Sequence, residues 1–204
     1  MIDKSNITAV ILAGGKGRRL AGQDKGLLEY RGKPLIQTVI DKIAPQVDHI
    51  IINANRNQKD YAEFGCPVIS DNLSDFQGPL AGFAIALQSC NTDYILTLPC
   101  DGPNLCNDYV TRLINATKNK NTIVVAHDGE HLQAVHALIP ISYLDNLLAF
   151  LNNGEREVKK WYAQNKIITV DFSDKPDAFF NINTEAHLLQ EQHQQNQNKG
   201  SNND

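Results

Sequence analysis

The chain has 204 residues, about the length of one domain, and 42% of them are hydrophobic, which is enough for a core. Its formal net charge of −4 argues against broad binding to nucleic acid or to a membrane surface, because both partners need a basic face. No apolar run reaches the length of a membrane span.

The first six residues are polar and do not start a signal peptide, so we expect a cytoplasmic chain. No Cys-x-x-Cys spacing occurs, and reduced thiols are therefore expected at Cys66, Cys90, Cys100 and Cys106. Residues 194–204 are rich in Gln and Asn and hold no apolar residue. We predict one domain over residues 1–193, followed by a disordered polar tail.

Short apolar runs alternate with helical patterns along the chain. Strands are expected at residues 8–12, 49–53, 66–70, 94–98, 122–127, 132–139 and 167–172. Helices are expected from Pro34 to about 43, over 58–64, from Gly78 to about 88, over 107–117, from a Ser142 cap to about 151, over 155–164 and from Thr184 to about 192. Residues 27–33 are expected to be extended, with a turn at Arg31-Gly32.

This alternation predicts an α/β fold: a three-layer α/β/α sandwich with a mostly parallel, Rossmann-like sheet. The turn at residues 128–130 predicts a small antiparallel element in the second half. Ligands of such sheets bind beyond the carboxyl ends of the strands. The polar positions just past those ends are the loop from Ala13, then Asn53, Asp71 and Asp101.

The loop after the first strand combines glycines with cations. Glycines let backbone N–H groups approach an anion, and lysine and arginine add full charge, so the loop predicts a triphosphate site. A Walker A loop is excluded because Gln23 and Asp24 stand where Lys and Ser/Thr are needed. A dinucleotide fingerprint is excluded because Leu20 stands at its third glycine. The loop residues concerned are Gly14, Gly15, Lys16, Gly17, Arg18, Arg19, Gly22 and Lys25.

The loop instead matches the pattern Leu-x-Gly-Gly-x-Gly-x-Arg, here residues 12–19, followed by Asp24-Lys25-Gly26-Leu27. With the Pro-Cys-Asp-x-Pro string around Asp101, the chain resembles the molybdenum cofactor guanylyltransferases, the MobA family, of the GT-A-like nucleotidyltransferases. The resemblance runs from about residue 7 to residue 189. It implies a GT-A-like sheet and a Mg²⁺-dependent, GTP-binding transferase of molybdenum cofactor biosynthesis.

The resemblance also implies the site. Asp101 would bind Mg²⁺, and Lys25 and Arg19 would act with it in catalysis. Nucleotide contacts would come from Leu12, Ala13, Gly14, Gly15, Lys25, Asn53, Asp71 and Asp101. Substrate contacts would come from Gly22, Gly78, Gly82, Arg156, Asn181 and Asn183.

Several of these residues also have a purely structural interpretation. Asp101 could serve a turn, and Lys25 or Arg156 could be solvated. Asn53, Asp71 and Asn183 could cap neighbouring segments, while Gly78 and Gly82 could form a tight helix entry. His136 is expected to be a packed or substrate-lining residue.

The implied reaction is transfer of GMP from GTP to Mo-molybdopterin with release of pyrophosphate. The alternatives are a CTP-dependent molybdopterin cytidylyltransferase, a sugar-1-phosphate nucleotidylyltransferase, and a non-catalytic nucleotide-binding protein for cofactor delivery. Further partners would be molybdoenzymes, their chaperones or other cofactor-biosynthesis proteins. We expect a monomer, with self-association left open.

Overall fold

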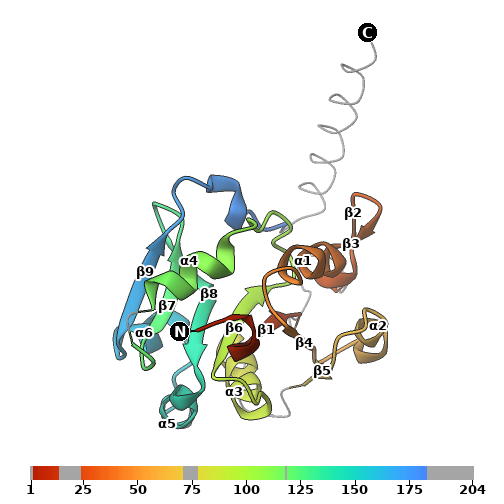
Figure 1. The fold of residues 1–204 in the computed structure, drawn as a ribbon. Helices are drawn as coiled ribbons and strands as arrows, with labels where there is room; N and C mark the ends of the chain where they lie inside the picture. The colour runs from red at the N-terminus through yellow and green to blue at the C-terminus, as the bar shows by residue number, and fades with distance from the viewer. Residues whose placement is uncertain (1, 14–23, 71–77, 118, 183–204) are drawn as a thin grey trace.

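A seven-stranded sheet forms the centre of the computed structural model, which describes residues 2–13, 24–70, 78–117 and 119–182 (Figure 1). The strands follow one another in the order β5-β4-β1-β6-β8-β7-β9. Strand β8 is antiparallel to both neighbours, and the other neighbouring pairs are parallel, so the predicted sheet and its antiparallel element are confirmed. The strands are β1 (Ile7–Leu12), β4 (His49–Asn53), β5 (Val68–Ile69), β6 (Tyr94–Pro99), β7 (Ile123–His127), β8 (Leu132–Pro140) and β9 (Ile167–Asp171).

Helices cover both faces of the sheet and complete the expected three layers (Figure 1). Buried side chains of α1, α2 and α4 belong to one core cluster, and those of α3, α5 and α6 belong to a second. The helices are α1 (Leu35–Ile43), α2 (Gln58–Ala62), α3 (Pro79–Ser89), α4 (Tyr109–Ala116), α5 (Leu144–Asn152) and α6 (Val158–Ala163). None of the helices among the described residues is long and apolar enough to cross a membrane.

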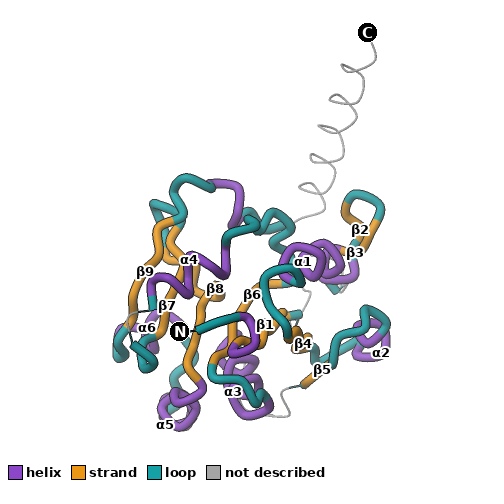
Figure 2. The backbone as a smooth tube through the Cα atoms, in the orientation of Figure 1, coloured by secondary structure: helices purple, strands orange, loops and turns teal. Residues whose placement is uncertain are grey.

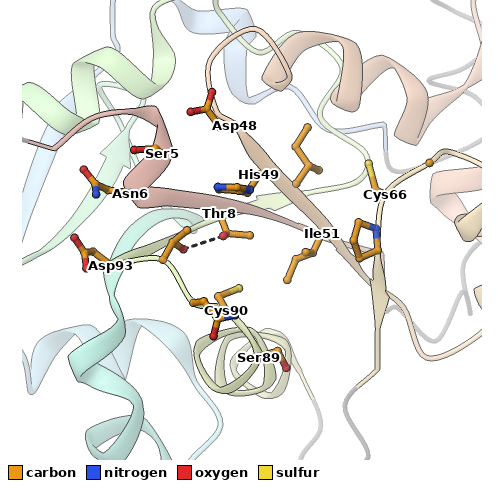
Figure 3. Close-up of a pocket in the computed structure, with 15 residues that line it drawn as sticks. Ser5, Asn6, Thr8, Asp48, His49, Ile51, Cys66, Ser89, Cys90 and Asp93 are labelled. Carbon is orange, nitrogen blue, oxygen red and sulfur yellow. Dashed lines mark hydrogen bonds between the residues drawn. The ribbon is translucent and has the colours of Figure 1, made fainter.

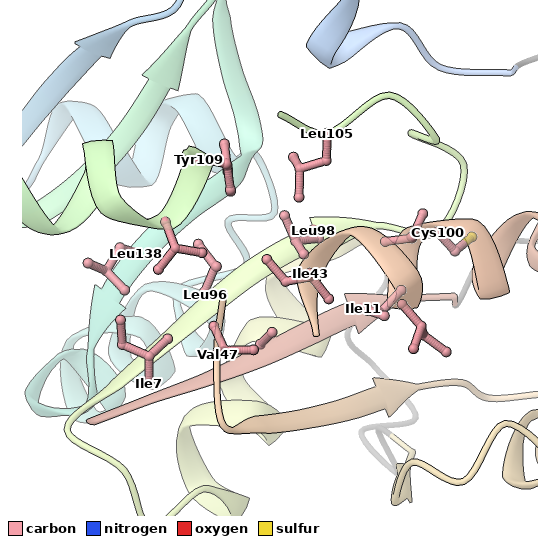
Figure 4. Close-up of a cluster of buried hydrophobic side chains, with 14 of the residues drawn as sticks. Ile7, Ile11, Ile43, Val47, Leu96, Leu98, Cys100, Leu105, Tyr109 and Leu138 are labelled. Carbon is pink, nitrogen blue, oxygen red and sulfur yellow. The ribbon is translucent and has the colours of Figure 1, made fainter. Parts of the chain in front are cut away.

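Alternation along β1 explains the two clusters. Ile7, Ala9 and Ile11 belong to the cluster that packs against α1 and α4, part of which is drawn in Figure 4. Val10 belongs to the cluster that packs against α3. Successive side chains of a strand point to opposite faces, so a strand such as β1, whose successive residues are buried, is covered on both faces. The uninterrupted apolar run of the sequence therefore places β1 at the middle of the sheet.

A small hairpin of β2 (Glu29–Tyr30) and β3 (Lys33–Pro34) leads from the first loop into α1 (Figure 2). Its turn has positive φ at both Arg31 (55°) and Gly32 (80°), as a two-residue hairpin turn of type I′ requires. The turn predicted at Arg31-Gly32 is thus confirmed, whereas the extended piece begins after Leu27, which ends a 3-10 turn. The four cysteines are free thiols, as expected from their spacing.

The predicted Ser142 helix cap is wrong. Residues Ile141–Tyr143 form a 3-10 turn that continues directly into α5, and Tyr143 already has helical dihedral angles. A capping side chain needs an extended backbone at the position before the helix, and this turn does not provide one. The Ser142 hydroxyl instead lies 3.5 Å from the side-chain oxygen of Asn121.

His136 of β8 is buried and packs against Tyr109 of α4 and Phe179. Its Nδ1 lies 3.3 Å from the Tyr109 hydroxyl, and its ring meets the Phe179 ring edge to face at 4.9 Å. Burial lowers the pKa of His136 to about 3, well below the ordinary value of 6.5. Of the two roles expected for this residue, the structure shows packing.

Replacing His136 by Gln is expected to flatten the acid side of the stability profile. The unfolded chain takes up a proton on this imidazole below about pH 6.5, whereas the folded chain does not until about pH 3. Stability is therefore lost as the pH falls through this window, by up to about 1.4 kcal/mol per pH unit. Urea unfolding from pH 7 to pH 4 measures the effect, with exposed His131→Gln as control, and parallel profiles for wild type and His136→Gln would contradict it.

Candidate active site

Three strand ends meet at one edge of the sheet. Leu12, the last residue of β1, is in register with Asn53 of β4 on one side and Pro99 of β6 on the other. Beyond the strands, the Ala13 N–H donates to the Asn53 carbonyl at 2.8 Å, and the Cys100 N–H donates to the Leu12 carbonyl at 3.2 Å. The chain runs outward from β1 to β4 and β5, then returns to add β6 on the other side, so this edge is a topological switch point where such sheets bind ligands.

Lys25 and Asp101 meet at this edge from loops 76 residues apart. The Lys25 Nζ lies 2.9 Å from Asp101 Oδ2, and the two side chains are 28% and 12% exposed. Because both side chains remain accessible to solvent, the contact between the cation and the carboxylate can open, and each group can then bind a charged ligand. The structure therefore brings together the two residues on which the sequence prediction depends most.

Asp101 also lies beside an oxygen that lacks a protein partner. The Ile182 N–H donates to the Asp101 carbonyl at 3.0 Å, which places Asn181 next to the aspartate. Within the described part of the chain, the buried Asn181 Oδ1 has no hydrogen-bond donor, and a Cβ built on Gly102 would lie 3.3 Å from it. A carboxylate and an amide oxygen are hard donors that suit Mg²⁺, which takes its remaining ligands from phosphates and water.

Asn53 is buried at the end of β4, and its side chain packs on α3. The Asn53 Nδ2 lies 3.5 Å from the Ile69 carbonyl, the outer limit for a hydrogen bond. A Cβ built on Gly82 would lie 2.6 Å from Asn53 Oδ1 and 2.8 Å from Leu12 Cδ2. Gly82 therefore leaves room for the side chains of two predicted nucleotide-binding residues.

Replacing Gly82 by Ala is expected to lower the free energy of unfolding by about 1–2 kcal/mol, as overpacking does. At an exposed position inside a helix, the same substitution would instead raise the free energy of unfolding, because alanine is favoured over glycine there by up to about 1 kcal/mol. Urea unfolding measures the change, and a stabilised variant would contradict the packing argument. In an Asn53→Ala background the loss should shrink, since one of the two close contacts is gone.

Gly78 and Arg156 have structural roles that the described contacts explain. Gly78 precedes α3 with φ of 108°, a conformation that favours glycine, and Pro79 occupies the first helical position. The Arg156 guanidinium donates to the Leu151 carbonyl at 2.7 Å, close to the end of α5, and to the Glu155 carbonyl. The backbone conformation of Gly78 fits a helix entry, and the Arg156 contacts fit a C-terminal cap of α5.

The opposite edge of the sheet holds a hollow of about 700 Å³ (Figure 3). The amino ends of β1 and β4 and the segment before β6 line it, and a 2.8 Å hydrogen bond joins Thr8 and Thr92 across its floor. This hollow contains none of the predicted site residues. It therefore lies away from the Lys25–Asp101 pair.

Comparison with known proteins identifies the family of the chain. Residues 9–168 match the model of the MobA-like NTP transferase domain. Over 180 residues the chain is 51% identical to a molybdenum cofactor guanylyltransferase of Shewanella putrefaciens, covering 88% of this chain and 92% of the relative. A Vibrio cholerae protein of the same name is 47% identical over 189 residues, covering 93% of each chain. The chain belongs to the MobA-like NTP transferase family.

Solved structures of the family and beyond share the fold. A molybdopterin-guanine dinucleotide biosynthesis protein A from Archaeoglobus fulgidus superposes with a TM-score of 0.77 at 21% identity, over 93% of this chain and 99% of that one. A 4-diphosphocytidyl-2C-methyl-D-erythritol synthase from Anaerococcus prevotii gives 0.71 at 12% identity, covering 95% and 97%. These structures confirm the fold predicted from sequence. The predicted resemblance to the MobA family is confirmed by the matching domain model and by the relatives at about half identity.

Several residues implied by the family resemblance lie outside the described residues. The same holds for the predicted helix from Thr184 and for the tail over residues 194–204. Their roles stay predictions. The site residues concerned are Gly14, Gly15, Arg19, Gly22, Asp71 and Asn183.

Tyr61 is a residue near the site that sequence reasoning did not single out. Its hydroxyl donates to Asp24 Oδ1 at 2.5 Å, directly beside Lys25 in the chain. An aromatic residue in a weak helical pattern indicates only a core position. The close contact between Tyr61 and Asp24 becomes visible only once β1 and β4 are paired.

Proposed function

We propose that the chain transfers GMP from GTP to Mo-molybdopterin, releasing pyrophosphate and giving the guanine dinucleotide form of the cofactor. The 2.9 Å pair of Lys25 and Asp101 at the switch point of the sheet carries this proposal. A triphosphate bound with a divalent ion needs a cation for its oxygens and a carboxylate for the ion. The names of the relatives at about half identity supply the acceptor and the base.

Asp101 would hold Mg²⁺, with the buried Asn181 Oδ1 as a second oxygen donor beside it. When bound, the ion supplies charge neutralisation on the triphosphate. Lys25, with Arg19 from the glycine-rich loop, would contact phosphate oxygens and stabilise the charge that grows on the leaving pyrophosphate.

The chemical step is one in-line substitution. A terminal phosphate oxygen of the pterin forms a bond to the α-phosphorus of GTP, and the bond from that phosphorus to the bridging oxygen breaks. The electron pair leaves with pyrophosphate. No general base is required, because the attacking phosphate is already ionised near neutral pH. The contribution of the protein is therefore positioning and charge stabilisation.

Asn53 and Asp71 are proposed to contact the base and the ribose. The Asn53 side chain is fixed between the end of β5 and α3, and its amide can offer both a donor and an acceptor to a base edge. Buried polar partners discriminate strongly against a ligand that leaves them unpaired. Gly78 and Gly82 would line the site beside Asn53. Candidates for substrate contacts are Gly22, Arg156 and Asn183.

The decisive experiment gives the enzyme Mg²⁺ and Mo-molybdopterin with GTP, CTP or ATP in turn, and follows pyrophosphate release and the dinucleotide product. The proposal expects GMP transfer to dominate. Faster CMP transfer would favour a cytidylyltransferase, the sibling that the resemblance disfavours because its members usually have alanine where Gly14 stands. Turnover with a sugar 1-phosphate instead of the pterin would favour that acceptor class, and GTP binding without any pyrophosphate would indicate a delivery protein.

A further inference from the structure

The Asp24 carboxylate is bound by two side chains of the segment that follows β4. The Tyr61 hydroxyl donates to Asp24 Oδ1 at 2.5 Å, and the Asn57 Nδ2 donates to Asp24 Oδ2 at 3.4 Å. Both Asp24 and Tyr61 are buried. The contacts thus join the loop after β1 to α2, two segments that lie 37 residues apart.

The position of Asp24 in its own loop does not account for these contacts. Asp24 immediately precedes the 3-10 turn Lys25–Leu27, where an aspartate would normally accept a hydrogen bond from the backbone of the turn. Its side chain makes no such capping bond. Both of its carboxylate oxygens point instead to α2 and the residue before it.

Gly26 leaves room for the Tyr61 hydroxyl. A Cβ built on Gly26 would lie 2.6 Å from the Tyr61 hydroxyl oxygen, and 3.2–3.3 Å from the nearest two ring carbons. Any larger residue at position 26 would therefore displace the hydroxyl from Asp24. Tyr61 thus lies against the residues on both sides of Lys25 in the chain, Asp24 and Gly26.

Lys25 thus lies between two fixed points. Its backbone follows Asp24, which Tyr61 holds, and its ammonium group meets Asp101 at 2.9 Å. A lysine side chain has four rotatable bonds, so the reach of its charge depends on where its backbone is held. We propose that Tyr61 is a positioning residue, acting through Asp24 to hold Lys25 at the Asp101 edge. The inference rests on the proposed function for its catalytic consequence.

The hydroxyl of Tyr61 remains a donor at every pH at which the enzyme works. Burial, followed by the nearby Cys100 and Asp24 groups, raises the pKa of Tyr61 well above its ordinary value. Titration of this group therefore adds no pH dependence near neutrality. A variant that lacks the hydroxyl tests the contact more directly.

The first test compares Tyr61→Phe with Tyr94→Phe. Tyr94 is equally buried, and its hydroxyl has no hydrogen-bond partner among the described residues, which makes it a matched control. We expect Tyr61→Phe to lower kcat about tenfold, because small misplacements of a catalytic group are costly. The KM for GTP should change less than kcat, and Tyr94→Phe should stay within about twofold of wild type. Equal turnover of the two variants would overturn the proposal.

The second test asks whether Tyr61 acts through Lys25. Residues that work as a unit are strongly non-additive, so Tyr61→Phe should change kcat less than about twofold in a Lys25→Ala background. A general loss of structure would lower kcat by the same factor in both backgrounds, and that result would refute a positioning role. Gly26→Ala provides a second perturbation: it should lower kcat in wild type but much less in Tyr61→Phe, whose ring lacks the crowded oxygen.

A readout without turnover separates this inference from the proposed function. The Leu27 and Leu28 N–H groups donate to the Asp24 and Lys25 carbonyls, at 3.1 and 3.2 Å. Their hydrogen exchange should become at least about tenfold faster in Tyr61→Phe and remain unchanged in Tyr94→Phe. Unchanged exchange in Tyr61→Phe would overturn the inference whatever the activity. A wild-type enzyme that releases no pyrophosphate, with exchange altered as expected, would overturn the proposed function alone.

Discussion

Replacing Asp101 by Ala is expected to lower turnover about a thousandfold, the upper range for loss of one preorganised group in a reaction centre. The variant loses the carboxylate that would hold the metal ion at the carboxyl end of β6. It also leaves Lys25 without the partner that it meets at 2.9 Å. Pyrophosphate release at saturating GTP and Mg²⁺ measures the effect.

The fold should survive this change. The Lys25 side chain is 28% exposed, so water can take the place of Asp101 beside its ammonium group. Loss of a hydrogen bond between charged groups costs about 1.5–3 kcal/mol, less than the stability of an ordinary domain. Asp93→Ala is the matched control, because Asp93 is exposed and immediately precedes β6, at the opposite end of the strand. Turnover of Asp101→Ala within about tenfold of the control would remove Asp101 from the reaction.

Asp101→Asn separates charge from shape. The amide keeps an oxygen toward the site but lacks the negative charge that a hard divalent ion prefers. We expect turnover near that of the alanine variant if metal binding dominates. A nearly normal Asn variant would instead indicate that the side chain only anchors its loop.

Much of the fold is contained in local sequence patterns. The uninterrupted apolar run at β1 indicates burial on both faces, and the alternation of strands and helices indicates parallel pairing. Boundaries are less accurate: the helix predicted over residues 107–117 begins only at Tyr109, and the Ser142 cap does not form. Both differences arise at helix starts: a turn precedes α4 and a 3-10 turn precedes α5. Helix ends are the least certain part of any sequence-based prediction.

The candidate site, too, could be predicted only in part from the sequence. Ala13, Asn53 and Asp101 follow from one rule, that the ends of parallel strands share an edge, and the structure places them together there. Tyr61 and the fit of Gly82 against Asn53 could not be predicted, because both depend on contacts between distant segments. A sequence pattern identifies which residues carry charge, whereas the residues that hold them in place are visible only in the packed structure.

Replacing Lys25 by Ala is expected to lower turnover about a hundredfold or more, because one positioned partner of the transition state is lost. The loss should persist at saturating GTP and Mg²⁺, where binding no longer limits the rate. Lys33→Ala is the matched control, since Lys33 lies on the neighbouring hairpin and forms an exposed ion pair with Asp41 of α1. Near-normal kcat in Lys25→Ala would remove Lys25 from the site.

The same variant tests what Lys25 does before the nucleotide binds. Its ammonium group lies on Asp101 Oδ2, the carboxylate that Mg²⁺ would use, so the lysine and the ion compete for one charge. Removing Lys25 should therefore lower the Mg²⁺ concentration that gives half-maximal turnover, even while kcat falls. If Lys25 instead only prepared Asp101 for the ion, the variant would need more Mg²⁺, and excess Mg²⁺ would restore its turnover. The direction of this shift thus distinguishes a lysine that acts on the triphosphate from one that merely supports the metal ligand.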